Sequence, residues 1–152
     1  MKWYQKFFRS FRYAGRGILH AVRNERNFRF HLVAAVLAHL LGLMAELPAG
    51  EMAEISLCCG LVIALELVNT AVEAVCDRVC TEQDPLIRIA KDVAAGAVLA
   101  AAVFTVIVAL WLFGEWIVSG GLWSAVLHRP VLDVCLLGVI AAGFFFVRWD
   151  GK

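Results

Sequence analysis

Two carboxylates and an amide, Glu66, Asn69 and Glu73, interrupt an otherwise apolar stretch of the chain. Each residue of an α-helix turns about 100° from the one before it, so Asp77 continues the face that these three share. We name this face the acidic stripe (Glu66, Asn69, Glu73 and Asp77) and expect it to run from mid-membrane to the membrane surface. An ionisable residue at the centre of a spanning helix costs roughly 2.5–3.5 kcal/mol. The stripe therefore predicts a metal-binding or proton-transfer site.

The elements that position the stripe are membrane helices. The chain has 152 residues, of which 62% are hydrophobic, and its mean hydropathy is +0.78. Residues 93–113 carry no charge and match the length that crosses about 30 Å of hydrocarbon. Residues 53–75 form a span that carries the stripe, and 30–46 form the first span. A fourth span is expected at 131–147, which is short and contains Asp133.

The basic residues predict the orientation of these spans. Eight Lys and Arg residues precede the first span, three lie in the 76–92 connection and two follow the last span. The connection at 47–52 has none, and 114–130 has only Arg129. Because basic residues favour the cytoplasmic side, we expect both termini there. The first residues are too charged for a cleaved signal peptide.

The N-terminal segment, 1–29, is predicted to be a basic amphipathic helix in the membrane interface. Its apolar side chains recur at three- and four-residue steps between arginines: Trp3, Phe7, Phe11, Ala14 and Ile18. A plain anchor to anionic lipid is one interpretation. The segment also holds Glu25 at the surface where the acidic stripe ends.

The 76–92 connection is expected to be a cytoplasmic loop, broken near its middle by Pro85. It is either a solvated connector or part of a site. Four of its charged residues lie near the end of the stripe: Glu82, Asp84, Lys91 and Asp92. Together with Glu25 and Glu73 they offer acids for a divalent metal and a cation for phosphate. Magnesium held by a few carboxylates and by substrate phosphates fits such a surface.

Other site types find little support. The chain has neither a GxxxxGK[ST] loop nor a GxGxxG motif, and its five cysteines lack zinc-site spacing. His31 and His39 are expected to be buried imidazoles with a structural role. The small residues at 94–102 are typical of a close helix-packing surface, which also suggests oligomerisation. A proton or ion path remains an alternative, because acids in membrane helices also mark such paths. A structural helper subunit would not explain the buried acids.

Three motifs in this order resemble the bacterial integral-membrane diacylglycerol kinase and undecaprenol kinase family. They are Asn24-Glu25-Arg26-Asn27-Phe28-Arg29, Glu66-Leu67-Val68-Asn69-Thr70-Ala71-Val72-Glu73 with Asp77, and Ala90-Lys91-Asp92-Val93-Ala94-Ala95-Gly96-Ala97. The resemblance covers about residues 6–113. The block from Glu25 to His31 and the run Asp84-Pro85-Leu86 look closer to the undecaprenol kinase branch. Residues 114–152 have no counterpart in these motifs.

The resemblance implies an ATP- and magnesium-dependent lipid kinase that acts as a homotrimer with shared active sites. Undecaprenol is the expected acceptor, and diacylglycerol, giving phosphatidic acid, is the alternative. Glu66 would be the general base, and Glu25 and Glu73 would hold Mg2+. The nucleotide site would include Tyr13, Gly17, Glu25, Asn69, Glu73, Glu82, Asp84, Lys91 and Asp92. The site would face the cytoplasm from a bacterial plasma (inner) membrane, and no nucleic-acid partner is expected.

The predicted fold is therefore an all-α integral membrane bundle. It combines the interfacial helix at 1–29, a three-span kinase core at 30–113, and a loop with a fourth transmembrane helix at 114–152.

Overall fold

The computed structural model describes residues 3–79 and 84–149 of the chain, and all regular structure in these ranges is α-helical. The helices are α1 (Trp3–Asn24), α2 (Arg26–Met44), α3 (Ala49–Val79), α4 (Pro85–Val118), α5 (Gly121–His128) and α6 (Pro130–Arg148). Four of them, α2, α3, α4 and α6, are long and apolar enough to cross a membrane. The predicted all-α bundle is confirmed, and the length and composition of these four helices agree with the four predicted spans.

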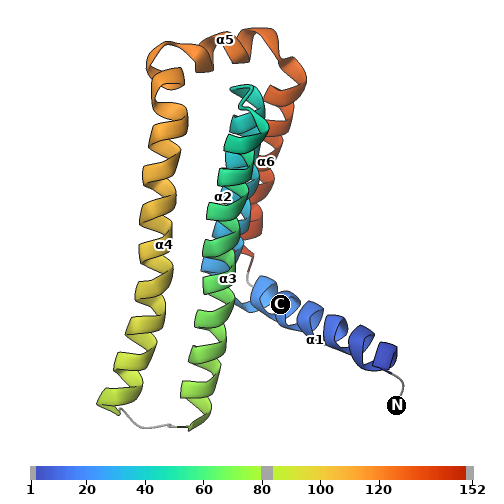
Figure 1. Cartoon of the computed structure of the whole chain (residues 1–152), viewed down its shortest axis with the longest axis vertical. Helices are drawn as coiled ribbons and strands as arrows, with labels where there is room; N and C mark the ends of the chain where they lie inside the picture. The colour runs from blue at the N-terminus through green and yellow to red at the C-terminus, as the bar shows by residue number, and fades with distance from the viewer. Residues whose placement is uncertain (1–2, 80–83, 150–152) are drawn as a thin grey trace.

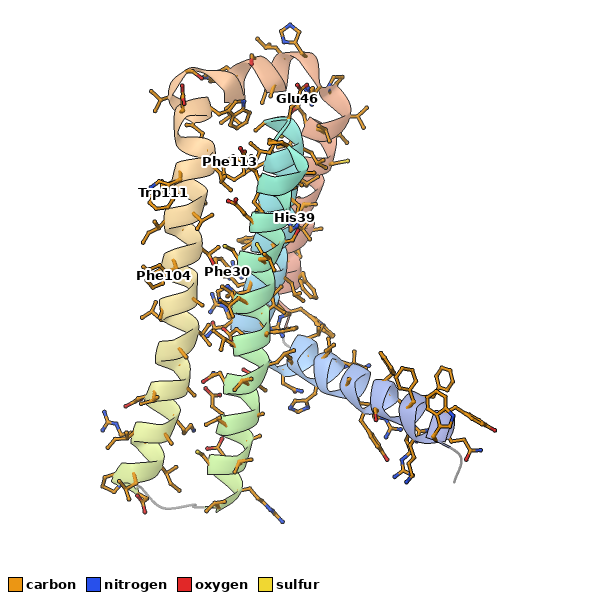
Figure 2. All side chains as sticks on the ribbon, in the orientation of Figure 1. Phe30, His39, Glu46, Phe104, Trp111 and Phe113 are labelled. Carbon is orange, nitrogen blue, oxygen red and sulfur yellow. The ribbon has the colours of Figure 1, made fainter. Side chains whose placement is uncertain are left out.

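The long helices α3 and α4 lie antiparallel and side by side, as Figure 1 shows. α2 packs against α3, and α6 packs against α2 rather than against α4. The short helix α5 crosses one end of the bundle and carries the chain from α4 to α6 (Figure 1). Arg129, at the start of α6, forms an ion pair with Glu46, which follows α2; Figure 2 labels Glu46 at this end.

The four spanning helices have two different lengths. At 1.5 Å per residue, the 19 residues of α2 and of α6 extend about 28 Å, close to the hydrocarbon thickness of a bilayer. The 31 residues of α3 and the 34 of α4 extend about 46 and 51 Å. Their excess length lies at the end opposite α5, beyond the start of α2 (Figure 1). We name this part, together with the turn of α3 that leads to it and the facing turn of α4, the α3–α4 projection (residues 67–79 and 85–97).

The loop predicted at 76–92 is mostly helical. α3 continues to Val79 and α4 begins at Pro85, so helices contain most of that segment. Pro85 starts the helix instead of breaking it, because a proline at the first helical position lacks only an N–H that would have no partner there. The Asp84 side chain accepts hydrogen bonds from the backbone N–H groups of Leu86 (2.7 Å) and Ile87 (3.4 Å).

The loop predicted at 114–130 is also largely helical. α4 runs on to Val118, and α5 occupies most of the remainder. The chain reverses at Gly120, whose φ of 80° lies in the left-handed region that glycine adopts without a steric penalty. This turn redirects the chain into α5 and so across the end of the bundle.

Side chains that point outward from the bundle are largely apolar. Phe104 and Trp111 project away from α4 in Figure 2, with 68% and 81% of their surface exposed. A small cluster of Val62, Val98 and Ala101 joins α3 to α4. An apolar exterior over a small interior is what a membrane helix bundle presents to lipid, where helix contacts depend on close packing rather than on exclusion of water.

α1 leaves the bundle at the start of α2 and extends to one side (Figure 1). Its aromatic residues pack against one another edge to face, with ring centroids of Phe7 and Phe11 4.9 Å apart. The helix predicted at 1–29 is confirmed for Trp3–Asn24, whereas residues 26–29 already belong to α2. Its lateral direction fits a helix that lies along a membrane surface.

Candidate functional site

The centre of the candidate site is the Glu66 side chain, which is buried with 4% of its surface exposed. Its Oε1 atom lies 3.3 Å from Nε2 of His31 on α2. The Thr70 hydroxyl donates a hydrogen bond of 3.0 Å to the backbone carbonyl of Glu66. The burial that the sequence predicts for this acid is present, and its direct partner is an imidazole.

The level of Glu66 along the bundle differs from the expected mid-membrane position. His31 lies within the second turn of α2, so Glu66 sits near the junction of α1 with α2. The rest of the acidic stripe continues from there along the α3–α4 projection. The stripe thus begins near one end of the short helices and extends away from them.

Glu25 joins the Glu66 region from the α1–α2 junction. It occupies the N-cap position of α2 in an extended conformation, and its side chain makes no capping hydrogen bond. His31, the partner of Glu66, lies at the same end of α2 as Glu25. The packing of α2 on α3 therefore brings Glu25 and Glu66, which are distant in the sequence, to the same end of the bundle.

Asn69 and Glu73 form the next level of the stripe. The Asn69 Nδ2 atom donates a hydrogen bond of 2.9 Å to Glu73 Oε1, one helical turn away. The Oδ1 atom of Asn69 is shielded from solvent and accepts no hydrogen bond from any described residue. A buried oxygen without a donor is rare, and it points to a cation, a donor group or water at this position.

Asp77 and Lys91 connect the two long helices at the outer end of the stripe. Lys91 Nζ donates a hydrogen bond of 2.8 Å to Asp77 Oδ1. The charge of Glu73 also acts on Lys91. The outer end of the stripe therefore has a cation, Lys91, paired with its last acid, Asp77. Both residues lie in the α3–α4 projection.

Several residues of the expected nucleotide site lie apart from this group. Tyr13 is exposed on α1, where the guanidinium of Arg9 lies 5.6 Å from its ring centroid. Gly17 is also on α1, and among the described residues nothing beyond its chain neighbours and its own helix backbone lies within 4 Å of the space that a side chain would occupy there. Asp84 caps α4, and Asp92 faces Arg88 at 3.8 Å with most of its side chain in solvent. Glu82 lies outside the described residues.

The described residues contain no preformed group of three or more His, Cys, Asp or Glu side chains for a metal ion. The Glu73 carboxylate and the Asn69 amide are nevertheless beside each other. Mg2+ usually keeps several waters and takes one or two protein carboxylates together with substrate phosphates. The arrangement can accept a proton at Glu66 and bind an anion near Lys91.

Sequence reasoning expected His31 to be a buried imidazole but did not predict its contact with Glu66. Its contact with Glu66 comes from packing of α2 on α3, over 35 positions of sequence, so helical periodicity within either helix could not reveal it. One feature of the sequence could have indicated this contact: His31 ends the motif block that starts at Glu25.

Comparisons with known proteins now identify the family. A model of the prokaryotic diacylglycerol kinase family matches residues 12–113. Undecaprenol kinase from Bacillus subtilis is 44% identical over 108 residues, which are 71% of this chain and 88% of that protein. Diacylglycerol kinase from Synechocystis is 45% identical over 100 residues, 65% of this chain and 57% of that protein. The Escherichia coli diacylglycerol kinase is 34% identical over 102 residues, 65% of this chain and 84% of that protein.

No solved structure gives a significant match. The family match spans more than half of the chain and includes the whole acidic stripe, Glu25, His31 and Lys91. The chain therefore belongs to the prokaryotic diacylglycerol kinase family, and the resemblance seen in the sequence is confirmed. It is a multi-pass membrane lipid kinase, and α5 and α6 lie outside the matched region.

Proposed function

We propose that this chain transfers the γ-phosphoryl group of ATP to the hydroxyl of undecaprenol, giving undecaprenyl phosphate. The observation that carries the proposal is the position of Glu66. It is a buried acid where the apolar helices meet the polar α3–α4 projection. A lipid hydroxyl reaches such a position from the bilayer, and a nucleotide reaches it from water.

The choice of undecaprenol rests on two observations. The Bacillus subtilis relative named undecaprenol kinase is matched over most of its length, and the block from Glu25 to His31 resembles that branch. Diacylglycerol is the second candidate, because the Synechocystis relative of similar identity is named diacylglycerol kinase. The apolar surfaces that would bind either lipid tail carry little information about specificity.

Glu66 is the proposed general base. As the lipid oxygen attacks the γ-phosphorus, its proton passes to the Glu66 carboxylate and ADP leaves with the bridging oxygen. His31, 3.3 Å from Oε1, would hold the carboxylate in the orientation that receives the proton. A positioned base contributes roughly 10²–10⁴-fold to such a transfer.

The remaining stripe residues would bind the nucleotide. Lys91 would contact a phosphate, and Asn69 would support the position of Glu73 through their 2.9 Å hydrogen bond. Magnesium fits this site, since Glu25 and Glu73 offer carboxylates and Asn69 Oδ1 is shielded without a donor among the described residues. When bound, this ion would neutralise phosphate charge.

The same proposal includes a homotrimer in a bacterial plasma (inner) membrane, with the site on the cytoplasmic side. Tyr13 and Gly17 lie on α1, which extends away from its own bundle (Figure 1). A neighbouring subunit could receive these residues next to its stripe, as in the shared sites that the family resemblance implies. The excess of basic residues near the N-terminus supports the cytoplasmic assignment.

The test compares purified full-length protein in detergent micelles with undecaprenol and with diacylglycerol, each supplied with radiolabelled ATP and Mg2+. Label in the undecaprenol product, lost in the Glu66→Gln variant, supports the proposal. Label only in the diacylglycerol product would reassign the acceptor while keeping the kinase mechanism. No label in either product would contradict both assignments.

A further inference from the structure

The junction of α1, α2 and α6 contains a polar cavity of about 710 Å³. Four of the residues that line it are arginines, and we name it the arginine pocket: Arg23, Arg26, Arg29 and Arg148. None of the four forms an ion pair with a carboxylate within residues 3–79 and 84–149. Four converging arginines that have no acid partner among the described residues indicate an anionic ligand.

Arg29 shows that the pocket is built into the fold. Only 4% of this residue is exposed. Its Nη1 atom donates to the carbonyl oxygens of Val22 (3.0 Å) and Arg23 (3.2 Å). Its Nη2 atom donates to the carbonyl of Val147 at 3.4 Å. The Nε atom is buried and has no hydrogen-bond partner among the described residues.

These contacts fix the Arg29 guanidinium without neutralising it. Backbone carbonyls satisfy its N–H groups in part but supply no negative charge. A buried charge without a counter-ion is costly, so an anion in the pocket would stabilise this arrangement. Guanidinium groups match phosphate oxygens in pairs of parallel hydrogen bonds.

The arginine pocket is separate from the candidate catalytic site. Arg29 and His31 are two positions apart on α2, so their side chains point about 200° apart around the helix axis. His31 faces Glu66 on α3, whereas Arg29 faces α6. Phe144, Val147 and Arg148 come from α6, outside the region that the family model matches. The arginine pocket therefore depends on α6, the helix that follows the kinase core in this chain.

We propose that the arginine pocket binds the phosphate group of an anionic membrane phospholipid. It lies where α1 leaves the bundle (Figure 1), the level at which an interfacial helix meets lipid headgroups. Phe144 lines the same pocket with 56% of its surface exposed, and the Arg148 guanidinium lies 5.0 Å from its ring centroid. An apolar ring beside the cations favours a lipid over a free phosphate ion. Basic pockets between membrane helices are suited to acidic headgroups.

The test is native mass spectrometry of the full chain in neutral detergent, titrated with dioleoyl phosphatidylglycerol or dioleoyl phosphatidylcholine. The pocket variant is Arg23→Gln with Arg148→Gln, which leaves the buried Arg29 in place. The matched control is Arg16→Gln with Arg78→Gln, two exposed arginines outside the pocket whose loss changes the net charge equally. Circular dichroism verifies that each variant keeps its helix content.

We expect wild-type protein and the control to prefer phosphatidylglycerol. The pocket variant should bind that lipid about tenfold more weakly, as loss of charge-assisted hydrogen bonds predicts. Equal weakening in the control would mean that net charge alone attracts the lipid, and this would overturn the assignment. Unchanged binding in the pocket variant would also overturn it. A third arm adds inorganic phosphate, and full displacement of the lipid at millimolar phosphate would reassign the pocket to a soluble anion.

Discussion

His31 on α2 and Glu66 on α3 face each other with Nε2 and Oε1 3.3 Å apart. This contact joins a helix that starts at the interfacial segment to the helix that carries the acidic stripe. The side chain of Glu66 is thereby held from outside its own helix, and a displaced α2 would release it. Substitution of either residue tests its part in catalysis.

Glu66→Gln should lower turnover by roughly 10²-fold or more, because the amide keeps the shape of the side chain but does not accept the proton. The helical content and oligomeric state should not change. Initial rates at saturating ATP and lipid provide the measurement. Turnover close to that of wild type would remove Glu66 from the mechanism.

His31→Ala should lower kcat about tenfold with little effect on the KM for ATP, since it removes a contact that orients the base rather than one that binds nucleotide. His39→Ala is a matched control. It removes an imidazole from the same helix, where His39 Nε2 lies 2.9 Å from the Ser56 hydroxyl. Equal losses of kcat in the two variants would assign the effect to packing of α2.

Glu25→Gln and Glu73→Gln should each raise the magnesium concentration needed for half-maximal activity. If both acids act on one ion, the double variant should lose less than the sum of the two single losses in ΔΔG‡. Activity is followed as a function of free Mg2+ at constant ATP. Strict additivity, or unchanged magnesium dependence in both single variants, would place the acids at separate sites.

Lys91→Gln should raise the KM for ATP about tenfold, because it removes a charge-assisted contact to phosphate. Its hydrogen bond to Asp77 lies at the exposed end of the α3–α4 projection. We therefore expect little change in melting temperature. Arg78→Gln removes the same charge from the last turn of α3 and should leave KM unchanged. A similar rise in KM for both variants would indicate a general effect of surface charge.

The topology can be tested by fusing a reporter that is active only in the cytoplasm after Lys152. Four spans return the C-terminus to the side of α1, so the reporter should be active. A second fusion at the α2–α3 turn, after Leu47, should be inactive. An inactive reporter after Lys152 would contradict a spanning α6 and would leave the kinase core unaffected.

The sequence predicts the helices well because long apolar runs and helical periodicity are local properties. Residues 93–113 and 131–147 lie within α4 and α6, and the four-residue spacing of Asn69 and Glu73 produces their hydrogen bond. The helix ends were predicted less well. Hydropathy marks the expected limits of a span in the bilayer, whereas the helices continue through the polar residues 76–79 and 85–92.

The contacts between helices could not be derived from local pattern. His31 meets Glu66, and Arg29 meets the Val147 carbonyl, only because α2 packs against both α3 and α6. Composition does not specify which faces of apolar helices pair in a membrane. An apolar side chain is in similar surroundings whether it contacts lipid or another helix, so burial against a neighbour gives no hydrophobic preference for one face. Tyr13 and Gly17 remain predictions for the nucleotide site, as does Glu82, which lies outside the described residues.

The difference in length between α2 and α3 determines how deeply ATP and the lipid acceptor must enter or leave the bilayer to reach the proposed site. α3 exceeds α2 by 12 residues, or about 18 Å, and most of this excess extends beyond the start of α2. If the site works as proposed, ATP needs no aqueous channel into the hydrocarbon. The lipid needs to raise only its terminal hydroxyl to the height of Glu66, and its long apolar tail stays in the bilayer. Chain length of the acceptor should then affect the rate much less than the chemistry near its hydroxyl.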